Sequence, residues 1–178
     1  LSGGRMDFGI GVGWCKEEVI ACGYSWEDRG PRCDEFLQTM INRWTQPVAS
    51  CEGKHVPLAP CRMDPKPVQN PHVPIIVGGH GKPSLRRAAR FGAGWYGFAL
   101  DVATTGAVLA ELDKALAAAG RSREGFEIVI TPISTTAEDL EGFKALGVDR
   151  LVVQLGSQKP ERVAQRMEEM ATMVEAAA

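Results

Sequence analysis

A short run of residues near the middle of the chain combines the residue types that bind phosphate. It follows an apolar segment that indicates a strand, and it precedes a segment with helical spacing. A glycine-rich turn at the start of a helix brings free backbone N–H groups together, and a lysine there adds positive charge. We therefore predict that this turn binds a phosphate group. Its residues are Gly78, Gly79, His80, Gly81 and Lys82.

A second glycine-rich strand end lies close to the start of the chain. The dinucleotide fingerprint Gly-x-Gly-x-x-Gly fails there, because Trp14 occupies the position of its third glycine. Gly11 and Gly13 lack Cβ atoms, so a flat cofactor ring can approach the backbone; alternatively, they only let the strand end turn sharply. Trp14, Trp95 and Tyr96 are candidates to contact such a ring. For Trp95 and Tyr96, packing in the barrel core is an equally good explanation of their presence.

Three arginines follow the phosphate-binding turn by one or two helical turns. Arg86, Arg87 and Arg90 either meet further negative charge on a ligand or act as solvated residues and partners of nearby acids. The sequence shows no nucleophile elbow and no pair of catalytic carboxylates, so it identifies no catalytic residue. The difficult chemistry is therefore expected to belong to a bound cofactor.

Composition and charge exclude several classes of protein. The chain has 178 residues, 44% of them hydrophobic and 24% charged, which is typical of a globular protein rather than a disordered one. The net charge of −2 gives no basic excess for nucleic acid, and no apolar run approaches the roughly 18 residues of a membrane span. Five cysteines without a C-x-x-C pair and three scattered histidines predict free thiols in the cytoplasm and no metal site.

Apolar periodicity predicts strands and helices that alternate about five times. The expected strands are 6–12, 74–79, 94–98, 126–130 and 150–155, and the expected helices are 31–44, 83–90, 108–119, 136–146 and 160–174. This alternation indicates an α/β fold on a parallel sheet, either doubly wound or a (β/α)8 barrel. The segment 46–74 holds seven of the eleven prolines and is expected to be a long loop or hairpin insertion.

Several segments of the chain, in this order and at this spacing, form a recognisable set. They are Leu-Ser-Gly-Gly-Arg at 1–5, Gly-Val-Gly-Trp at 11–14, Arg-Gly-Pro-Arg-Cys-Asp-Glu at 29–35, Pro-Lys-Pro-Val-Gln at 65–69, Pro-Ile-Ile-Val-Gly-Gly at 74–79, Leu-Arg-Arg-Ala-Ala-Arg-Phe-Gly at 85–92, Gly-Trp at 94–95 and Leu-Gly-Val-Asp-Arg-Leu at 146–151. Together they resemble the luciferase-like monooxygenase superfamily, in the branch of coenzyme F420-dependent oxidoreductases. The resemblance covers nearly the whole chain and is most specific over residues 1–100.

The resemblance implies a (β/α)8 TIM barrel that binds FMN or coenzyme F420 at its C-terminal mouth. A barrel takes about 250 residues, and the chain starts at Leu1 rather than at methionine. We therefore expect residues 1–178 to be the C-terminal portion of a single barrel domain, an incomplete barrel of about five βα units with the 46–74 insertion. About three further units, and with them a histidine that is catalytic in several members, would precede it.

The resemblance also implies roles for the two glycine-rich strand ends. The cofactor phosphate would lie on Gly78, Gly79, Gly81 and Lys82, beside His80, and the cofactor ring would lie near Gly11, Gly13 and Trp14. Two departures stand out: Trp14 replaces the acidic catalytic residue of the sugar-phosphate-oxidising branch, and Ala93 replaces the aspartate of the usual Gly-Asp-Gly-Trp. Oxidation of sugar phosphates is therefore not expected.

The expected protein is an oxidoreductase or monooxygenase that uses coenzyme F420 or, as the alternative, FMN. The basic residues after the phosphate-binding turn favour F420, because its oligoglutamate tail is anionic. We expect a cytoplasmic homo-oligomer, a dimer, acting on a small molecule, without nucleic acid or membrane partners. Two alternatives stay open: a phosphate-binding barrel isomerase or aldolase, and a non-catalytic homologue or fragment.

Overall fold

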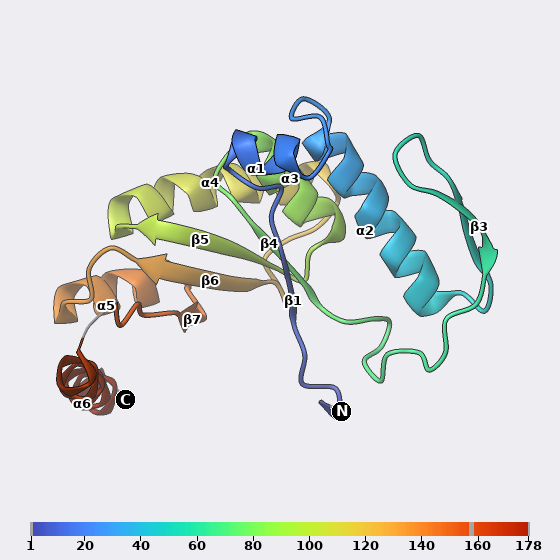
Figure 1. Ribbon diagram of the computed structural model, residues 1–178. Coiled ribbons are helices and arrows are strands. Elements are labelled where there is room, and N and C mark those ends of the chain that lie inside the picture. The colour runs from blue at the N-terminus through green and yellow to red at the C-terminus, as the bar shows by residue number, and fades with distance from the viewer. Residues whose placement is uncertain (1, 157–158, 178) are drawn as a thin grey trace.

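The computed structural model describes residues 2–156 and 159–177, and its centre is a sheet of five parallel strands. The strand order is β1-β4-β5-β6-β7, so neighbours in the sheet follow the chain except where the proline-rich segment intervenes (Figure 1). The strands are β1 (Phe8–Ile10), β4 (Ile75–Gly78), β5 (Gly94–Leu100), β6 (Glu127–Pro132) and β7 (Arg150–Leu151). This confirms the α/β fold with a parallel sheet.

Helices connect the strands, and the second to the fifth of them cover one face of the sheet. The helices are α1 (Lys16–Ala21), α2 (Arg29–Thr45), α3 (Lys82–Phe91), α4 (Val102–Ala118), α5 (Ala137–Ala145) and α6 (Pro160–Ala177). Figure 1 shows α2, α3 and α4 on the same side of the sheet. The core lies in this layer, where Leu37 of α2, Leu112 of α4 and Phe143 of α5 are almost completely buried.

Side chains alternate between the two faces of each inner strand. Val77, Trp95 and Ile128 belong to the core between the sheet and the helices. Their neighbours Ile76 and Tyr96 line a cavity on the other face of the sheet. Because successive side chains of a strand point to opposite faces, the short apolar runs of the sequence divide into a core half and a cavity half.

The sheet does not close on itself within the described residues. β1 and β7 are its two edges, and β1 pairs only with β4 while β7 pairs only with β6. Five parallel strands with helices on one face form an incomplete barrel, as expected. In the same residues, no helix combines the length and the apolar composition that crossing a bilayer requires.

The proline-rich segment contains an antiparallel hairpin, β2 (Ala49–Glu52) and β3 (Pro57–Cys61), which packs beside α2 (Figure 1). Glu35 on α2 fastens the tip of this hairpin, because its Oε2 accepts the backbone N–H groups of His55 at 2.6 Å and Val56 at 3.1 Å. These two donors hold the pKa of Glu35 below its ordinary value. The insertion is thus fixed to the outside of the helical layer.

Two expected boundaries lie furthest from those of the structure. The helix expected over 108–119 begins at Val102, where the Asp101 carboxylate accepts the backbone N–H of Thr104 at 2.7 Å and caps it. The strand expected over 150–155 ends at Leu151, because ladder pairing with β6 stops there. In contrast, the cap expected at Thr136 is present as a capping box with Asp139.

Candidate functional site

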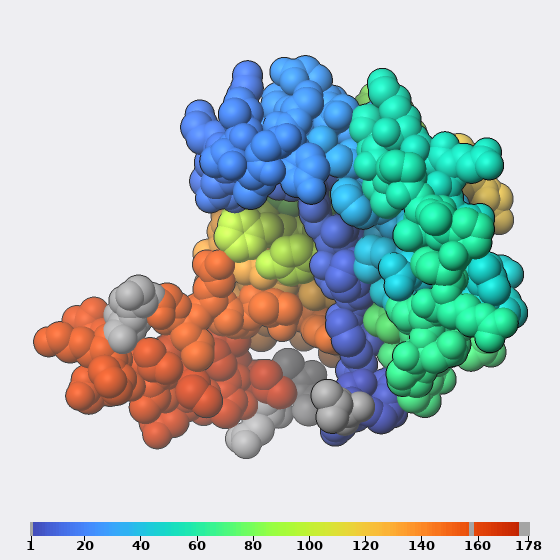
Figure 2. All heavy atoms as spheres, turned by 45° about the vertical axis from the view of Figure 1, so that its right-hand side comes forward, coloured from blue at the N-terminus to red at the C-terminus, as the bar shows by residue number. Residues whose placement is uncertain are grey.

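A cavity of about 800 Å³ lies on the open face of the sheet and joins the two glycine-rich strand ends. Gly11 and Trp14 line it from the end of β1, and Gly78, Gly79 and His80 line it from the end of β4. Figure 2 shows the hollow beneath the N-terminal helices, with atoms of β5 exposed in it. A volume of this size suits a cofactor or a drug-sized ligand.

Gly13, Gly81 and Lys82 are the sequence candidates that do not line this cavity. Gly13 has a φ of +81° and turns the chain toward α1, where an added Cβ would meet Val19 at 3.8 Å. Gly81 is the N-cap of α3, and Lys82 is its exposed first residue. Lys82 lies instead in a small cavity of about 210 Å³ between α3 and α4, with Arg86 and Lys114.

The turn from β4 into α3 is tied to β5 by its backbone. The Gly79 N–H donates to the Tyr96 carbonyl at 3.3 Å, and the Gly79 carbonyl accepts the indole N–H of Trp95 at 2.8 Å. Gly79 has a φ of +114°, and a Cβ there would lie 2.7 Å from Ser84 Oγ. Only glycine fits this position without strain.

The N-terminus of α3 leaves backbone donors without partners in the described part of the chain. Gly81 supplies no side-chain cap, and Pro83 has no N–H. The first intrahelical bond runs from Leu85 N–H to the Gly81 carbonyl at 3.1 Å, so the N–H groups of Lys82 and Ser84 have no intrahelical acceptor. A helix N-terminus of this kind, entered through glycines, fits a phosphate group.

The cavity beside β1 has room for a flat ring. A Cβ built on Gly9 or Gly11 would meet no atom within 4 Å, so these glycines border open space rather than packed neighbours. Trp14 is 89% exposed over the same cavity. Further along the sheet the walls are largely apolar, with Ile76 and Val129 among them.

Charged groups close the opposite end of the cavity, at the start of the strands. Arg150 Nη2 lies 2.7 Å from a carboxylate oxygen of Glu127 and 3.8 Å from one of Asp7. Toward the C-terminal ends of the strands, the Tyr96 hydroxyl shares a hydrogen bond of 2.6 Å with Thr131 Oγ1. The charged groups at the start of the strands therefore pair with one another, and the phosphate-binding features lie at the other end of the cavity.

Two residues proposed for ligand contact have structural roles instead. The Trp95 side chain is completely buried in the core, so it cannot wall a cofactor ring, whereas Tyr96 faces the cavity. Arg87 is also buried: its Nε donates to Asp34 at 2.5 Å and its Nη2 donates to the Gly30 carbonyl at 3.1 Å. Arg87 therefore joins α3 to α2, and only Arg86 and Arg90 remain exposed.

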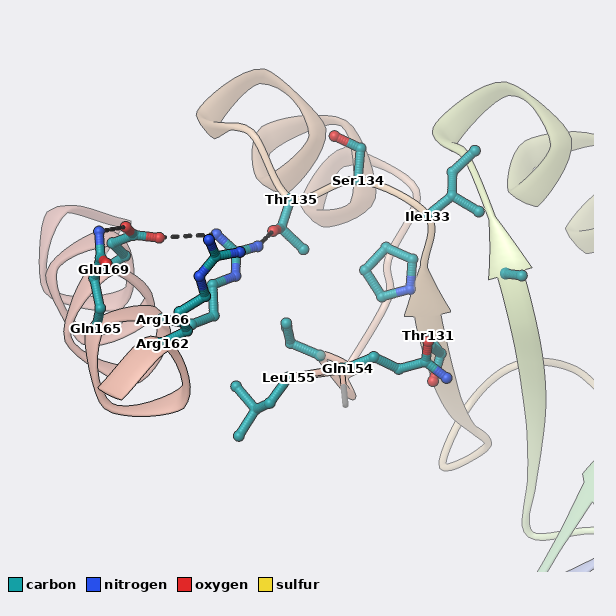
Figure 3. A pocket seen from close by; sticks show the side chains of 14 residues that line it. Thr131, Ile133, Ser134, Thr135, Gln154, Leu155, Arg162, Gln165, Arg166 and Glu169 are labelled. Carbon is teal, nitrogen blue, oxygen red and sulfur yellow. Dashed lines mark hydrogen bonds and ion pairs between the residues drawn. The ribbon is translucent and has the colours of Figure 1, made fainter. Parts of the chain in front are cut away.

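A second cavity, of about 760 Å³, lies between the loop that follows β6 and helix α6 (Figure 3). Arg166 donates to Thr135 Oγ1 at 2.8 Å and to a Glu169 oxygen at 3.3 Å, and Arg162 faces the same space. Sequence reasoning missed this cavity. Two arginines one helical turn apart and the hydroxyl-rich loop before α5 were the signals that could have indicated it.

The cysteines and the acidic side chains show no further site. All five cysteines are free thiols, and burial raises the pKa of Cys33 above its ordinary value, which keeps this thiol protonated and inert. Across residues 2–156 and 159–177, no three His, Cys, Asp or Glu side chains are grouped so that they could hold a metal ion.

Several known proteins are similar to this chain in sequence or in structure. An uncharacterized protein of Mycobacterium tuberculosis is 32% identical over 173 residues, which cover 96% of this chain and 60% of that protein. The FMNH2-dependent dimethylsulfone monooxygenase of Pseudomonas putida is 32% identical over 99 residues, 54% of this chain and 27% of the enzyme. Among solved structures, an F420-dependent secondary alcohol dehydrogenase matches with a TM-score of 0.71 at 16% identity, over 84% of this chain and 64% of that chain.

The chain thus spans about 60% of the length of the mycobacterial relative. The family model of the luciferase-like monooxygenases matches residues 1–177, which is almost the whole sequence. The open parallel sheet, with its ligand-sized cavity at the glycine-rich strand ends, agrees with that match. This chain belongs to the luciferase-like monooxygenase family.

Proposed function

We propose that the full-length protein is an oxidoreductase that binds coenzyme F420, or alternatively FMN, in the cavity of the open sheet face. The observation that carries this proposal is that both glycine-rich strand ends line one cavity, with an uncapped helix N-terminus beside it. A ring and a phosphate need two such sites at once, on the same side of a sheet.

The two ends of the proposed site have different roles. The free N–H groups at the start of α3 would hold the phosphate, in a turn shaped by Gly78 and Gly79, and the nearby Lys82 would add positive charge. Gly11 and Trp14 would lie beside the ring. The bound cofactor supplies hydride transfer, and reduced FMN also supplies activation of O2.

The chain itself positions the cofactor and keeps water from part of its surface. Ile76 and Val129 offer apolar contact on the cavity wall, and Tyr96 places a hydroxyl there whose orientation Thr131 fixes. Such walls favour an aromatic ring over a hydrated ion. Strands of the full-length protein, in this proposal, complete the site, and a small-molecule substrate binds against the exposed side of the ring.

The exposed cations beside α3 favour coenzyme F420 over FMN. Lys82, Arg86 and Arg90 lie at or after the phosphate-binding turn, and none of them is buried. The oligoglutamate tail of F420 carries several carboxylates, whereas FMN ends at its phosphate. Positive charge near the phosphate end therefore adds more attraction for F420, which carries these carboxylates besides its phosphate, than for FMN.

Titration of the purified full-length protein with F420, FMN and riboflavin tests this proposal. Riboflavin carries the ring of FMN without the phosphate, so it isolates the contribution of the phosphate-binding turn. We expect saturable binding of F420 or FMN, followed by absorbance or fluorescence, and at least tenfold weaker binding of riboflavin than of FMN if FMN binds. Absence of binding by both F420 and FMN would contradict the proposed function.

A further inference from the structure

The second cavity, between the loop after β6 and helix α6, adjoins the first cavity on the open sheet face. Tyr96 lines the first cavity and Thr131 lines the second, and their hydroxyl groups share a hydrogen bond of 2.6 Å. On β6 itself, Val129 lines the first cavity, and Thr131 follows two residues later. Two residues along a strand span roughly 7 Å, so a small molecule can reach from one cavity into the other.

The described lining of the second cavity has a surplus of one positive charge. Its charged residues are Arg162, Arg166 and Glu169, all on α6. Glu169 is already occupied, since one carboxylate oxygen accepts from Arg166 at 3.3 Å and the other accepts from Gln165 at 3.0 Å. Arg166 also donates to Thr135 Oγ1 at 2.8 Å.

Arg162 is the cation that these contacts leave over. Among the residues that the structure describes, its guanidinium has no ion pair and no side-chain hydrogen bond, and it extends toward the same space as Arg166 (Figure 3). Side chains four residues apart lie on one face of a helix, where two like charges repel each other. An anion in the cavity would relieve this repulsion.

The backbone at the end of β5 is strained where it borders the second cavity. Ala99 has a φ of +53°, a left-handed conformation that is unfavourable for a residue with a Cβ. The pairing register with β6 shifts there, between Phe98 and Leu100, so that Leu100 enters the core while Ala99 lines the cavity. Strain and bulges of this kind cluster at functional sites. The strained residue and the unpaired cation thus belong to one cavity.

The surroundings of Arg162 fit a carboxylate. One carboxylate neutralises a surplus of one positive charge, and the planar guanidinium can bind both of its oxygens at once. Ile133 and Leu155 give the cavity apolar surface for a hydrocarbon part of the ligand. We propose that the second cavity binds a carboxylate group of the substrate through Arg162, and that the substrate extends past Tyr96 toward the cofactor. This inference rests on the proposed function, which supplies the ring.

Hexanoate and hexanamide test the proposal on the full-length protein without cofactor, because they differ in charge but not in chain length. Binding is followed by 1H–15N NMR through backbone amide and arginine Nε–H signals, and R162Q assigns the signal of Arg162. We expect hexanoate to shift this signal saturably and hexanamide to leave it in place. R162Q should bind hexanoate at least fivefold more weakly than the wild type.

K159Q is the matched control, because it removes one positive charge three residues before Arg162. Lys159 is exposed and does not belong to the described lining of the cavity. We expect K159Q to bind hexanoate within twofold of the wild type. Equal losses in R162Q and K159Q would mean that only general charge attraction acts. That result, or an Arg162 signal that hexanoate does not shift, would overturn the proposal.

Titrations with F420 and FMN distinguish a substrate carboxylate from the carboxylates of the F420 tail. We expect R162Q to bind both cofactors within twofold of the wild type. Weaker binding of F420 with unchanged binding of FMN would assign Arg162 to the tail and overturn its assignment to the substrate. If the wild type binds hexanoate at Arg162 but neither cofactor, the proposed function fails. If it binds a cofactor and R162Q keeps full hexanoate affinity, only the carboxylate site fails.

Discussion

The two glycine-rich strand ends that line the cavity differ in how firmly the rest of the molecule holds them. At the end of β4, hydrogen bonds from Trp95, Phe98 and Gly79 tie the turn to β5. At the end of β1, a Cβ added to Gly11 would have no neighbour within 4 Å, and Trp14 is almost fully exposed. Helix α1, which follows, has no buried residue.

This difference indicates that the two ends of the proposed site have different roles, one in binding the phosphate and one in contacting the ring. A preformed turn binds an anion without first having to be ordered, so the phosphate end is the natural anchor. The open end at β1 adapts to a ring and depends on what else covers it. Substitutions at the β4 end should therefore change affinity, and those at the β1 end should change turnover.

The largest effect is expected from G79A, which breaks the anchor. A residue with a Cβ at a φ of +114° is strained by roughly 1–3 kcal/mol, and this Cβ would also press on Ser84. We expect lower thermal stability and cofactor binding weakened far more than tenfold. G120A is the matched control: Gly120 also has a positive φ, +70°, far along the chain with open space around it. It should lose stability while keeping cofactor affinity.

The next effect is expected from G81V, which leaves the fold intact. Gly81 has a φ of −76°, and a Cβ there would touch only Pro83 at an ordinary 3.6 Å. A branched side chain at the N-cap would still obstruct the approach of a phosphate to the free N–H groups. We expect cofactor binding weaker by at least tenfold, about 1.4 kcal/mol, at unchanged melting temperature. Unchanged affinity in a titration would show that the phosphate binds elsewhere.

The third prediction addresses the open end of the cavity through W14A. Because the Trp14 side chain is 89% exposed, its removal should change the free energy of unfolding by less than about 0.5 kcal/mol. Loss of the side chain beside the ring should lower kcat several-fold, which is measured with a substrate of the full-length protein. Measurement of kcat and of denaturant unfolding on the same variant separates the effect on turnover from the effect on stability. A loss of stability that exceeds the loss of turnover would place Trp14 in the fold rather than in the site.

The smallest effect is expected from R86A, which sharpens the choice of cofactor. An exposed arginine contributes little in salt, so we expect F420 affinity to fall about twofold to threefold at low ionic strength and less at about 0.5 M salt. FMN affinity should fall less, because FMN offers Arg86 only its phosphate and no carboxylate tail. Equal losses for both cofactors would remove the argument for F420.

Local sequence signals predicted the parts of the fold that local interactions control. The capping box at Thr136 was found because its two partners are three residues apart. The start of α4 was missed, since Thr104, Thr105 and Gly106 are weak helix formers and the cap at Asp101 stands apart from the apolar pattern. The end of β7 was misplaced because a strand lasts only as long as its partner pairs with it.

The candidate site was predictable as two clusters and not as a list of contacts. Parallel strands place their C-terminal ends at one edge, so glycine-rich ends near positions 11 and 79 were expected to meet, and both line the same cavity. The sequence did not show which of Trp95 and Tyr96 faces the cavity, or which of Arg86 and Arg87 is exposed. In each pair, one residue faces the ligand side or solvent and its neighbour is buried in the core.

By itself the sequence determined the parallel α/β architecture, the family and the two glycine-rich ends, because periodicity and motif spacing are properties of the chain alone. Only the tertiary structure decided which side chains reach the cavity, since strand register sends each residue to one face or the other. It also brought Arg87 into hydrogen-bonding contact with Asp34, 53 residues away, and the His80 ring into contact with the backbone N–H of Phe98. Such partners are brought together by packing, and no local pattern encodes them.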